Sequence, residues 1–244
     1  MRWQQVALVV LGLACRIAAA SGLQVSPVTL TLAPSQNADG LWLSNTGDNV
    51  VHAQVRVYRW TQENGEEKLT PSRNILVSPP MLELAATDRQ LIRIIRTGAP
   101  PSGAGAVEEA YRVIIDELPV EGQEPKKGLK FVLRYSVPIF VEPAGAAPAA
   151  PQLTWSLSRN GDHAVLDVAN GGGTHAQLAA LNFVDAAGRR TVVHDGLLGY
   201  VLPGAQMRWT LKPPVAAFAA GGSMETMING NTTQQSLPPI ERAR

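Results

Sequence analysis

Cysteine is almost absent from this chain of 244 residues, and aromatic side chains make up only 5% of it. Cys15 is the single cysteine, so the rest of the sequence has no thiol to form a disulfide or bind a metal. No serine lies between glycines in the spacing of a nucleophile elbow. The four histidines lie in separate segments without the spacing of metal ligands: His52, His163, His175 and His194. The sequence therefore predicts no catalytic residue, no metal site and no cofactor.

A strong charge of either sign is also lacking. The formal net charge is +1 and charged residues make up 17% of the chain, which predicts no broad surface for nucleic acid or for an anionic membrane. After the first twenty residues, no segment approaches the roughly 20 apolar residues of a membrane helix. We therefore expect no nucleic-acid partner and no membrane insertion.

The first twenty residues have the pattern of a secretory signal. Arg2 is followed by an apolar run over residues 6–14 and by a group of alanines that ends at Ala20. This pattern predicts a signal peptide over residues 1–20, cleavage near Ala20 and export. Two alternatives are an uncleaved anchor and a lipid-modified Cys15, although Gly12 stands where lipidation motifs usually have a bulky apolar residue.

From Leu23 onward, short apolar or alternating runs are separated by Gly, Pro, Asn and Asp, which is typical of an all-β sandwich. Seven such runs in the first half predict one immunoglobulin-like domain over residues 21–143. The predicted strands are 23–32, 40–45, 52–62, 76–78, 90–97, 110–118 and 129–141.

The segment AGAAPAAP, residues 144–151, contains no side chain able to build a core, so it is the predicted linker between two domains. The second half repeats the same pattern and predicts a smaller immunoglobulin-like sandwich over residues 152–244. Its predicted strands are 153–158, 164–169, 176–185, 191–194, 206–212 and 223–229.

The last predicted strand before the linker has a distinctive alternation. Leu129, Phe131, Leu133 and Tyr135 point to one side of the strand, and the intervening residues point to the other. Two interpretations follow from this pattern. The four side chains either fill the core of their own domain or are offered to a partner protein.

Motifs spread over nearly the whole chain resemble one known family. They include LQVSPVTLTLAP, LWLSNTGDN, RVYRWTQ, QLIRIIR, YRVIIDELP, LRYSVPIFVEP and GYVLPG, in that order. The chain is similar to the periplasmic pilus chaperones of the chaperone–usher pathway, and within them to the archaic, spore-coat-U-like fimbrial branch.

This resemblance implies two immunoglobulin-like domains in a boomerang arrangement. It also implies a periplasmic chaperone that captures pilus subunits by donor-strand complementation and delivers them to an outer-membrane usher. Leu129, Phe131, Leu133 and Tyr135 match the donor row of the family. Whether two free copies associate through this strand stays open.

The sequence departs from the family at two basic positions that bind the subunit's terminal carboxylate. Thr29 and a position at or near Pro138 stand there instead. Another cation is needed if a carboxylate is bound, because charge-assisted hydrogen bonds make such contacts strong. Arg112 is the first candidate, and Arg134 and Arg93 are weaker ones. The alternative for each is an exposed charge on a strand's solvent face.

Arg112 is preferred for its position in the alternation of its strand. If Tyr111, Val113 and Ile115 fill the core, Arg112 and Ile114 lie on the opposite face. A second departure is a glutamate, residue 142, where the family often has an arginine in an interdomain salt bridge. We therefore expect other contacts to fix the domain orientation.

The alternative function is a secreted two-domain adhesin or carbohydrate-binding protein. Such a protein would need exposed aromatic side chains gathered around a groove. Trp42, Trp60, Trp155 and Trp209 lie in strand-like runs, where we expect them to pack in a core.

Overall fold

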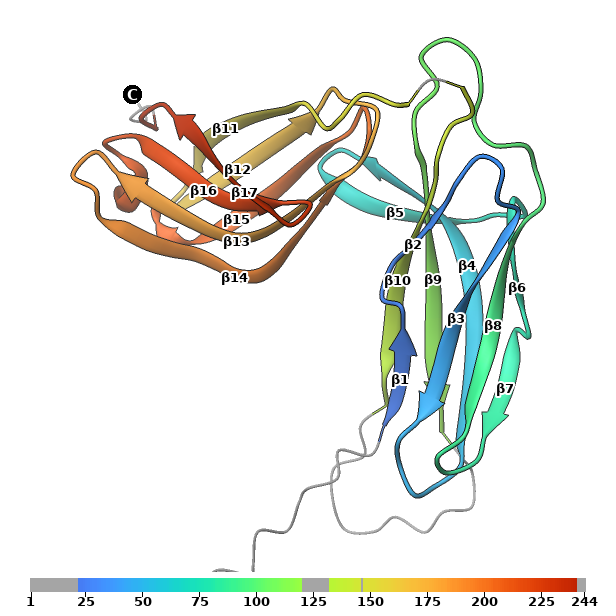
Figure 1. The fold of residues 1–244 in the computed structure, drawn as a ribbon. Helices are drawn as coiled ribbons and strands as arrows, with labels where there is room; N and C mark the ends of the chain where they lie inside the picture. The colour runs from blue at the N-terminus through green and yellow to red at the C-terminus, as the bar shows by residue number, and fades with distance from the viewer. Residues whose placement is uncertain (1–21, 120–131, 146, 241–244) are drawn as a thin grey trace, which may run out of the picture.

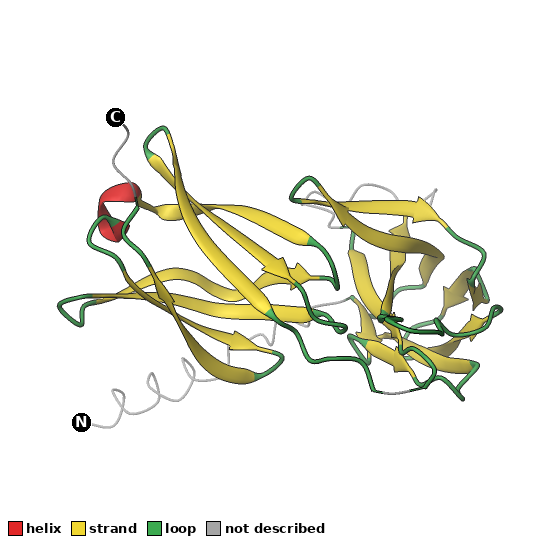
Figure 2. Cartoon of the chain, turned by 90° about the horizontal axis from the view of Figure 1, so that it is seen from above, coloured by secondary structure: helices red, strands yellow, loops and turns green. Residues whose placement is uncertain are grey.

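The computed structural model describes residues 22–119, 132–145 and 147–240. These residues form two β-sandwiches joined end to end, and the long directions of the two sandwiches differ, so the molecule is bent (Figure 1). The predicted all-β fold with two immunoglobulin-like domains is confirmed. Figure 2 shows the two sandwiches from above, with one short 3-10 helix, η1 (Val215–Phe218), at the far end of the second.

Two sheets build the first domain. Sheet A has the order β1-β3-β8-β6, and sheet B has the order β2-β10-β9-β4-β5, with β7 paired to β4. The strands of sheet A are β1 (Leu23–Ser26), β3 (Ala38–Asn45), β8 (Arg89–Arg96) and β6 (Ile75–Ser78). Those of sheet B are β2 (Leu30–Leu32), β10 (Arg134–Val141), β9 (Glu109–Leu118), β4 (Val51–Glu63), β5 (Glu66–Pro71) and β7 (Met81–Leu84).

Alternate residues of both sheets point into the space between them. Leu41 and Leu43 of β3 and Ile92 of β8 meet Val113 and Ile115 of β9, and all five side chains are fully buried. Fully burying one such side chain stabilises the fold by roughly 1.5–3 kcal/mol. The period-two pattern of the sequence therefore sets which face of each strand is the core.

The prediction of one continuous strand over residues 23–32 was wrong. Residues 23–32 form two strands, because β1 pairs with β3 in sheet A whereas β2 pairs with β10 in sheet B. Pro27 lies between them, and a proline has no N–H with which to continue a strand ladder. The strands β5 and β7 were not predicted.

The second domain is also made of two sheets. Sheet C has the order β11-β12-β15, and sheet D has the order β14-β13-β16-β17. The strands of sheet C are β11 (Leu153–Asn160), β12 (His163–Asn170) and β15 (Gln206–Pro214). Those of sheet D are β14 (Arg190–Val201), β13 (Ala176–Asp185), β16 (Gly222–Ile228) and β17 (Asn231–Leu237).

The core of this domain includes an edge-to-face pair of Phe183 and Phe218, with ring centroids 4.8 Å apart. Leu166 and Leu178 approach it from the two sheets. The strand β17 was not predicted, because six of its seven residues are polar and exposed. An edge strand of this kind lacks the apolar alternation that marks a strand in sequence.

The expectation that four tryptophans pack in cores was wrong for Trp42. Trp60 and Trp155 are buried and Trp209 is partly buried against the second core, but Trp42 is 39% exposed. Leu41 and Leu43 take the core positions of β3, so Trp42 between them must point to solvent.

Candidate functional site

The first feature of the site is an unpaired edge on β10. β9 pairs with the whole length of β10, whereas β2 pairs only with Ile139–Val141 of that strand. Within the described residues, no strand pairs with the other side of Arg134–Pro138. A row of main-chain groups is therefore open to another strand.

The hydrogen bonds on either side of β10 give the direction of these groups. The N–H of Glu117 on β9 donates to the carbonyl of Leu133 at 2.9 Å, and the N–H of Glu142 donates to Leu32 on the β2 side at 3.0 Å. Because the direction alternates along a strand, Arg134 and Ser136 present their main-chain groups to the open edge.

The side chains of β10 form an apolar row whose burial decreases toward the start of the strand. Val137 and Ile139 are buried in the first core, Tyr135 packs partly against it, and Leu133 just before the strand is half-buried. Of the four predicted donor residues, Leu133 and Tyr135 therefore share the core-facing side. The other two, Leu129 and Phe131, lie outside the described residues.

Tyr135 connects β10 to the first strand of the domain. Its hydroxyl donates a hydrogen bond to the carbonyl oxygen of Leu23. Burial raises the pKa of the Tyr135 hydroxyl, and the nearby carboxylate of Glu117 adds to this shift. The phenol therefore stays protonated and able to donate this bond.

A group of three charged residues holds the open half of β10 to its neighbours. Arg134 of β10 and Arg56 of β4 both bind the carboxylate of Asp116, which lies on the strand between them. Burial acts to raise the pKa of Asp116, but the hydrogen bonds from Arg134 and Arg56 outweigh it and leave the pKa below its usual range. The carboxylate is thus held in its charged form.

The second feature of the site is an apolar cluster between the two domains. Trp60 and Phe140 from the first domain pack with Tyr200 and Leu202 from the second. The rings of Trp60 and Tyr200 meet edge to face, with centroids 5.4 Å apart. We call this the junction cluster.

Arg112 lies in the junction cluster. Its guanidinium is 3.6 Å from the centroid of Trp60 and 5.2 Å from that of Tyr200, and only 10% of its side chain is exposed. Tyr111, Val113 and Ile115 are in the first core, as predicted. The predicted placement of Arg112 on the opposite face of β9 is therefore confirmed.

The polar contacts of Arg112 are long for so buried a cation. Nη2 is 3.4 Å from Oε1 of Glu67, Nη1 is 3.5 Å from the carbonyl oxygen of Ser136, and the buried Nε has no partner. Burial lowers the pKa of Arg112, although the carboxylate of Glu67 opposes this shift. The guanidinium therefore keeps hydrogen-bonding capacity that its own chain does not use.

The other two predicted anchors lie elsewhere. The side chain of Arg134 is 68% exposed and is bound to Asp116, at the end of β10 far from the junction cluster. Arg93 is exposed on β8 of sheet A, which is the opposite sheet of the sandwich. Of the three arginines, only Arg112 lies at the junction.

Hydrogen bonds across the junction fix the two domains further. Gln62 of β4 donates from Nε2 to the carbonyl of Tyr200 at 2.8 Å and accepts at Oε1 from the N–H of Leu202 at 2.9 Å. Glu108 accepts from the main-chain N–H of His175 at 3.1 Å and contacts its Nδ1 at 2.7 Å. No sequence pattern indicated that these residues would be partners.

A tight turn provides another contact between the domains. Gly65, at the tip of the β4–β5 hairpin, accepts a hydrogen bond from the N–H of Arg208 on β15 at 3.3 Å. Its φ of +82° lies in the left-handed region, and a Cβ there would be 2.9 Å from the Cβ of Arg208. A side chain at residue 65 would therefore push the two domains apart.

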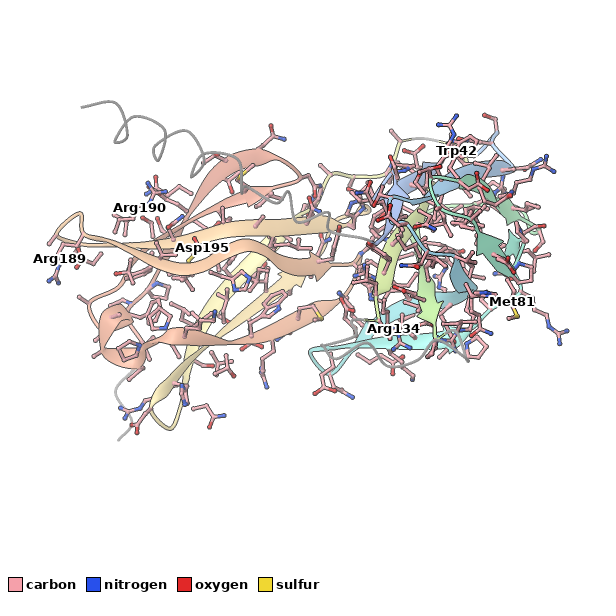
Figure 3. All side chains as sticks on the ribbon, turned by 90° about the horizontal axis from the view of Figure 1, so that it is seen from below. Trp42, Met81, Arg134, Arg189, Arg190 and Asp195 are labelled. Carbon is pink, nitrogen blue, oxygen red and sulfur yellow. The ribbon has the colours of Figure 1, made fainter. Side chains whose placement is uncertain are left out.

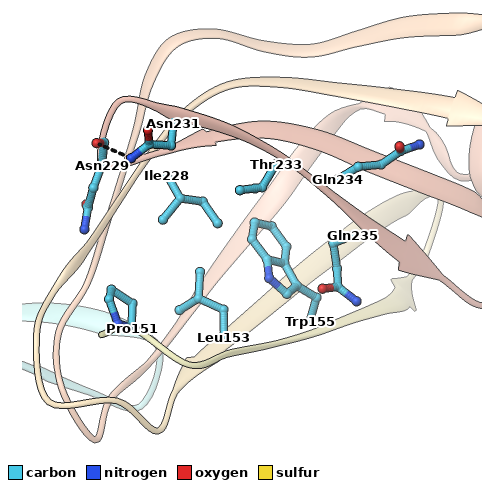
Figure 4. Close-up of a pocket in the computed structure, with 9 residues that line it drawn as sticks. All are labelled: Pro151, Leu153, Trp155, Ile228, Asn229, Asn231, Thr233, Gln234 and Gln235. Atoms are coloured by element: carbon cyan, nitrogen blue, oxygen red, sulfur yellow. Dashed lines mark hydrogen bonds between the residues drawn. The ribbon is translucent and has the colours of Figure 1, made fainter. Parts of the chain in front are cut away.

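A groove of about 410 Å³ lies in the second domain, between the edge strands β11 and β17 (Figure 4). Its lining includes Leu153, Ile228 and a row of amide side chains, with Trp155 as its one aromatic residue. Trp155 is only 8% exposed. The groove therefore lacks the gathered exposed aromatics on which the carbohydrate-binding alternative depends.

No group of three or more His, Cys, Asp and Glu side chains is arranged to hold a metal ion among the described residues. No described helix has the length and hydropathy that a membrane span requires.

Comparison with known proteins assigns the fold and the family. The model of the pili and flagellar-assembly chaperones, PapD N-terminal domain, matches residues 22–147, more than half of the chain. The fold and this match define an assembly chaperone with two immunoglobulin-like domains. The chain belongs to the pili and flagellar-assembly chaperone family. No curated protein sequence matches the chain.

Solved structures share the fold across both domains. The chain is similar to one in the CsuC–CsuE chaperone–tip adhesion subunit complex of archaic Csu pili from Acinetobacter baumannii, with a TM-score of 0.70, 22% identity and coverage of 91% of this chain and 100% of that one. It also matches a chain of the Salmonella enterica SafA pilin–SafB chaperone complex, with a TM-score of 0.61, 19% identity and coverage of 89% and 97%. The E. coli chaperone DraB gives a TM-score of 0.57 at 16% identity, with coverage of 91% and 97%.

The ion pairs around Asp116 predict a pH-dependent loss of stability on Asp116→Asn. Because the folded-state pKa of Asp116 is lowered, its stabilising contribution is fully present above the ordinary aspartate pKa of about 3.9 and is lost as the pH falls below that value and through the lowered folded-state pKa. We expect a melting temperature about 2–4 °C lower than that of the unchanged chain at about pH 7. The difference in melting temperature should shrink as the pH is lowered from about 5 to about 2, because Asp116 becomes protonated; an equal difference at about pH 7 and at about pH 2 would contradict the account.

The double hydrogen bond of Gln62 predicts that Gln62→Ala loosens the junction. The substitution leaves the buried main-chain groups of Tyr200 and Leu202 without partners, which costs about 2 kcal/mol. Denaturant unfolding measures this loss, and small-angle X-ray scattering should show a wider range of shapes. Gln36→Ala, at a half-buried position away from the junction whose side chain bonds only the main chain of Ala38, is the control; if both variants behave alike, Gln62 does not fix the domains.

Proposed function

We propose that this chain is a periplasmic chaperone of the archaic branch that captures immature pilus subunits and delivers them to an outer-membrane usher. The observation that carries the proposal is the open edge of β10 beside a row of apolar side chains. An extended strand of a subunit pairs with this edge and covers the apolar row. The chaperone acts by binding alone, without a cofactor.

The main chain and the side chains of β10 contribute to capture in different ways. Arg134 and Ser136 offer main-chain groups that pair with a strand of any sequence. Leu133 and Tyr135, together with Leu129 and Phe131 before them, supply the apolar contacts that select a subunit with an incomplete core. Each side chain that becomes fully buried contributes roughly 1.5–3 kcal/mol before the cost of ordering.

The end of the open edge explains the role proposed for Arg112. β2 occupies the edge from Ile139 onward, so an added strand must stop near Pro138. Pro138 lies opposite Arg112 in the β9–β10 register, and the Arg112 guanidinium reaches over β10 to the carbonyl of Ser136. A strand that ends there and runs parallel to β10 brings its terminal carboxylate to Arg112.

Arg112 can accept this carboxylate at little cost. It is already desolvated, and its stacking on Trp60 holds the guanidinium plane in place. The contact to Glu67 at 3.4 Å is long enough to be replaced by a shorter, charge-assisted one. Arg134 and Arg93 do not reach this position.

Export supports the same function. The pattern of residues 1–20 predicts a signal peptide cleaved near Ala20, and a periplasmic chaperone must be exported in this way. Delivery to an usher is inferred from the resemblance to the chaperone–usher family and from the similarity in fold to the Csu complex.

Leu133→Asp tests the donor row. We expect the variant to lose at least about tenfold in co-purification with a subunit encoded beside it, because a carboxylate cannot enter the subunit core. Val132→Asp is the matched control, since Val132 is adjacent, 52% exposed and on the opposite side of the strand. Far-UV circular dichroism of both free variants should equal that of the unchanged chain. Equal loss in the two variants would contradict the proposal.

Arg112→Met tests the anchor. Subunit capture should fall at least about tenfold, whereas the free chaperone should keep or gain thermal stability, because a buried cation with long contacts is removed. Arg93→Met, which removes an exposed arginine from the opposite sheet, should retain most of the capture. If Arg112→Met captures the subunit normally, the carboxylate is bound elsewhere.

A further inference from the structure

The outer face of sheet A is an unusual surface for which the proposed function has no role. Its outward positions alternate with the core positions of β1, β3, β8 and β6, and none of them carries a carboxylate. The larger side chains on this face are Trp42, Leu76, Arg89, Leu91, Arg93 and Ile95. We call it the cationic–apolar face.

The two arginines of this face have no acidic partner. Arg89 lies over the ring of Trp42, with its guanidinium carbon 4.5 Å from the ring centroid. Arg93 is opposite Gly40 on β3 and Ser78 on β6. Within the described residues, neither arginine has a salt bridge or a side-chain hydrogen bond.

The face is also apolar and shallow. Trp42 is 39% exposed and Leu76 is 47% exposed, although each lies within a strand. Gly40 has no side chain, and the side chain of Leu91 lies directly over it. A Cβ at residue 40 would be only 2.5 Å from Cδ1 of Leu91. An extended segment can therefore lie across the strands without a steric block.

This surface stays open when β10 is occupied. Sheet A and sheet B are the two opposite layers of the first sandwich, and β10 belongs to sheet B. Figure 3 shows Trp42 and Arg134 on opposite sides of the first domain. A partner on the cationic–apolar face and a strand added to β10 can therefore bind at the same time.

We propose that the cationic–apolar face binds an acidic, apolar segment of a partner protein other than the subunit. The stacked Arg89 keeps the edge of its guanidinium free for a carboxylate, and Arg93 offers a second cation four residues further along β8, with Leu91 between them. Leu76 and Trp42 flank them with exposed apolar surface. A segment that carries both carboxylates and apolar side chains satisfies both features.

Two other occupants fit the face less well. A second copy of this face would bring Arg89 and Arg93 against the same arginines, and like charges at close range are repulsive. An anionic lipid surface would gain from both cations. However, Arg89 covers one face of the Trp42 ring and holds the ring in place, so it cannot insert freely between lipids.

Isothermal titration calorimetry with a blocked peptide of alternating glutamate and leucine tests the proposal on the mature protein. The peptide should bind the unchanged chain, with an affinity that falls as salt is raised. The double variant Arg89→Ser/Arg93→Ser should bind at least about tenfold more weakly. A second peptide, with glutamine in place of glutamate, serves as a control. Its binding to the unchanged chain should be as weak as the binding of the acidic peptide to the double variant.

Matched variants separate this face from β10 and from general charge effects. Arg189→Ser/Arg190→Ser removes two positive charges from the second domain and should bind the peptide normally. Leu133→Asp should also bind it normally, so the result does not depend on the donor strand. The proposal would be overturned if the peptide does not bind, or if it binds the Arg89/Arg93 variant as well as the unchanged chain. It would also be overturned if Leu133→Asp loses binding, or if the unchanged chain binds phosphatidylglycerol vesicles more strongly than the peptide.

Discussion

The constraint on which the rest of the structure depends is the incomplete pairing of β10. β2 pairs only with Ile139–Val141. β10 therefore has a closed half, paired on both sides, and an open half, paired with β9 alone. The closed half holds the core of the first domain together through Ile139 and Val141. The open half stays ordered because β9 pairs with it and because Asp116 binds Arg134. A rigid strand with one free edge is thus built into an otherwise closed sandwich, and a rigid edge loses little conformational freedom when a partner strand joins it.

The junction between the domains lies where β2 closes the open edge of β10, because Pro138 is opposite Arg112 in the strand register. Trp60 and Tyr200 enclose Arg112, and Gln62 ties the same region to the main chain of the second domain. Among the described residues, Glu142 forms no ion pair between the domains. This agrees with the expectation that other contacts fix the domain orientation. A buried guanidinium is costly when its hydrogen bonds are long. That cost is reasonable at a binding site, where a ligand supplies the missing contacts.

Much of the fold could be predicted because the strands of the core alternate clearly. The predicted strand 110–118 differs from β9 by one residue, and its alternation also placed Arg112 on the correct face. The strand β17 was missed because an exposed edge strand needs no apolar residues. Trp42 was misplaced because residue type alone does not give the phase of the alternation. The partners of Arg112 could not be predicted, since Trp60 and Tyr200 meet only when two separate domains pack together.

The most direct test of the open edge is amide hydrogen exchange of the main chain of β10, measured by NMR with and without a bound subunit. The N–H groups of Arg134 and Ser136 point to the free edge, so they should exchange rapidly in the free chaperone and become protected in the complex. The N–H of Val137 points to β9 and should be protected in both states. Continued rapid exchange of Arg134 and Ser136 in the complex would show that the subunit does not pair with this edge.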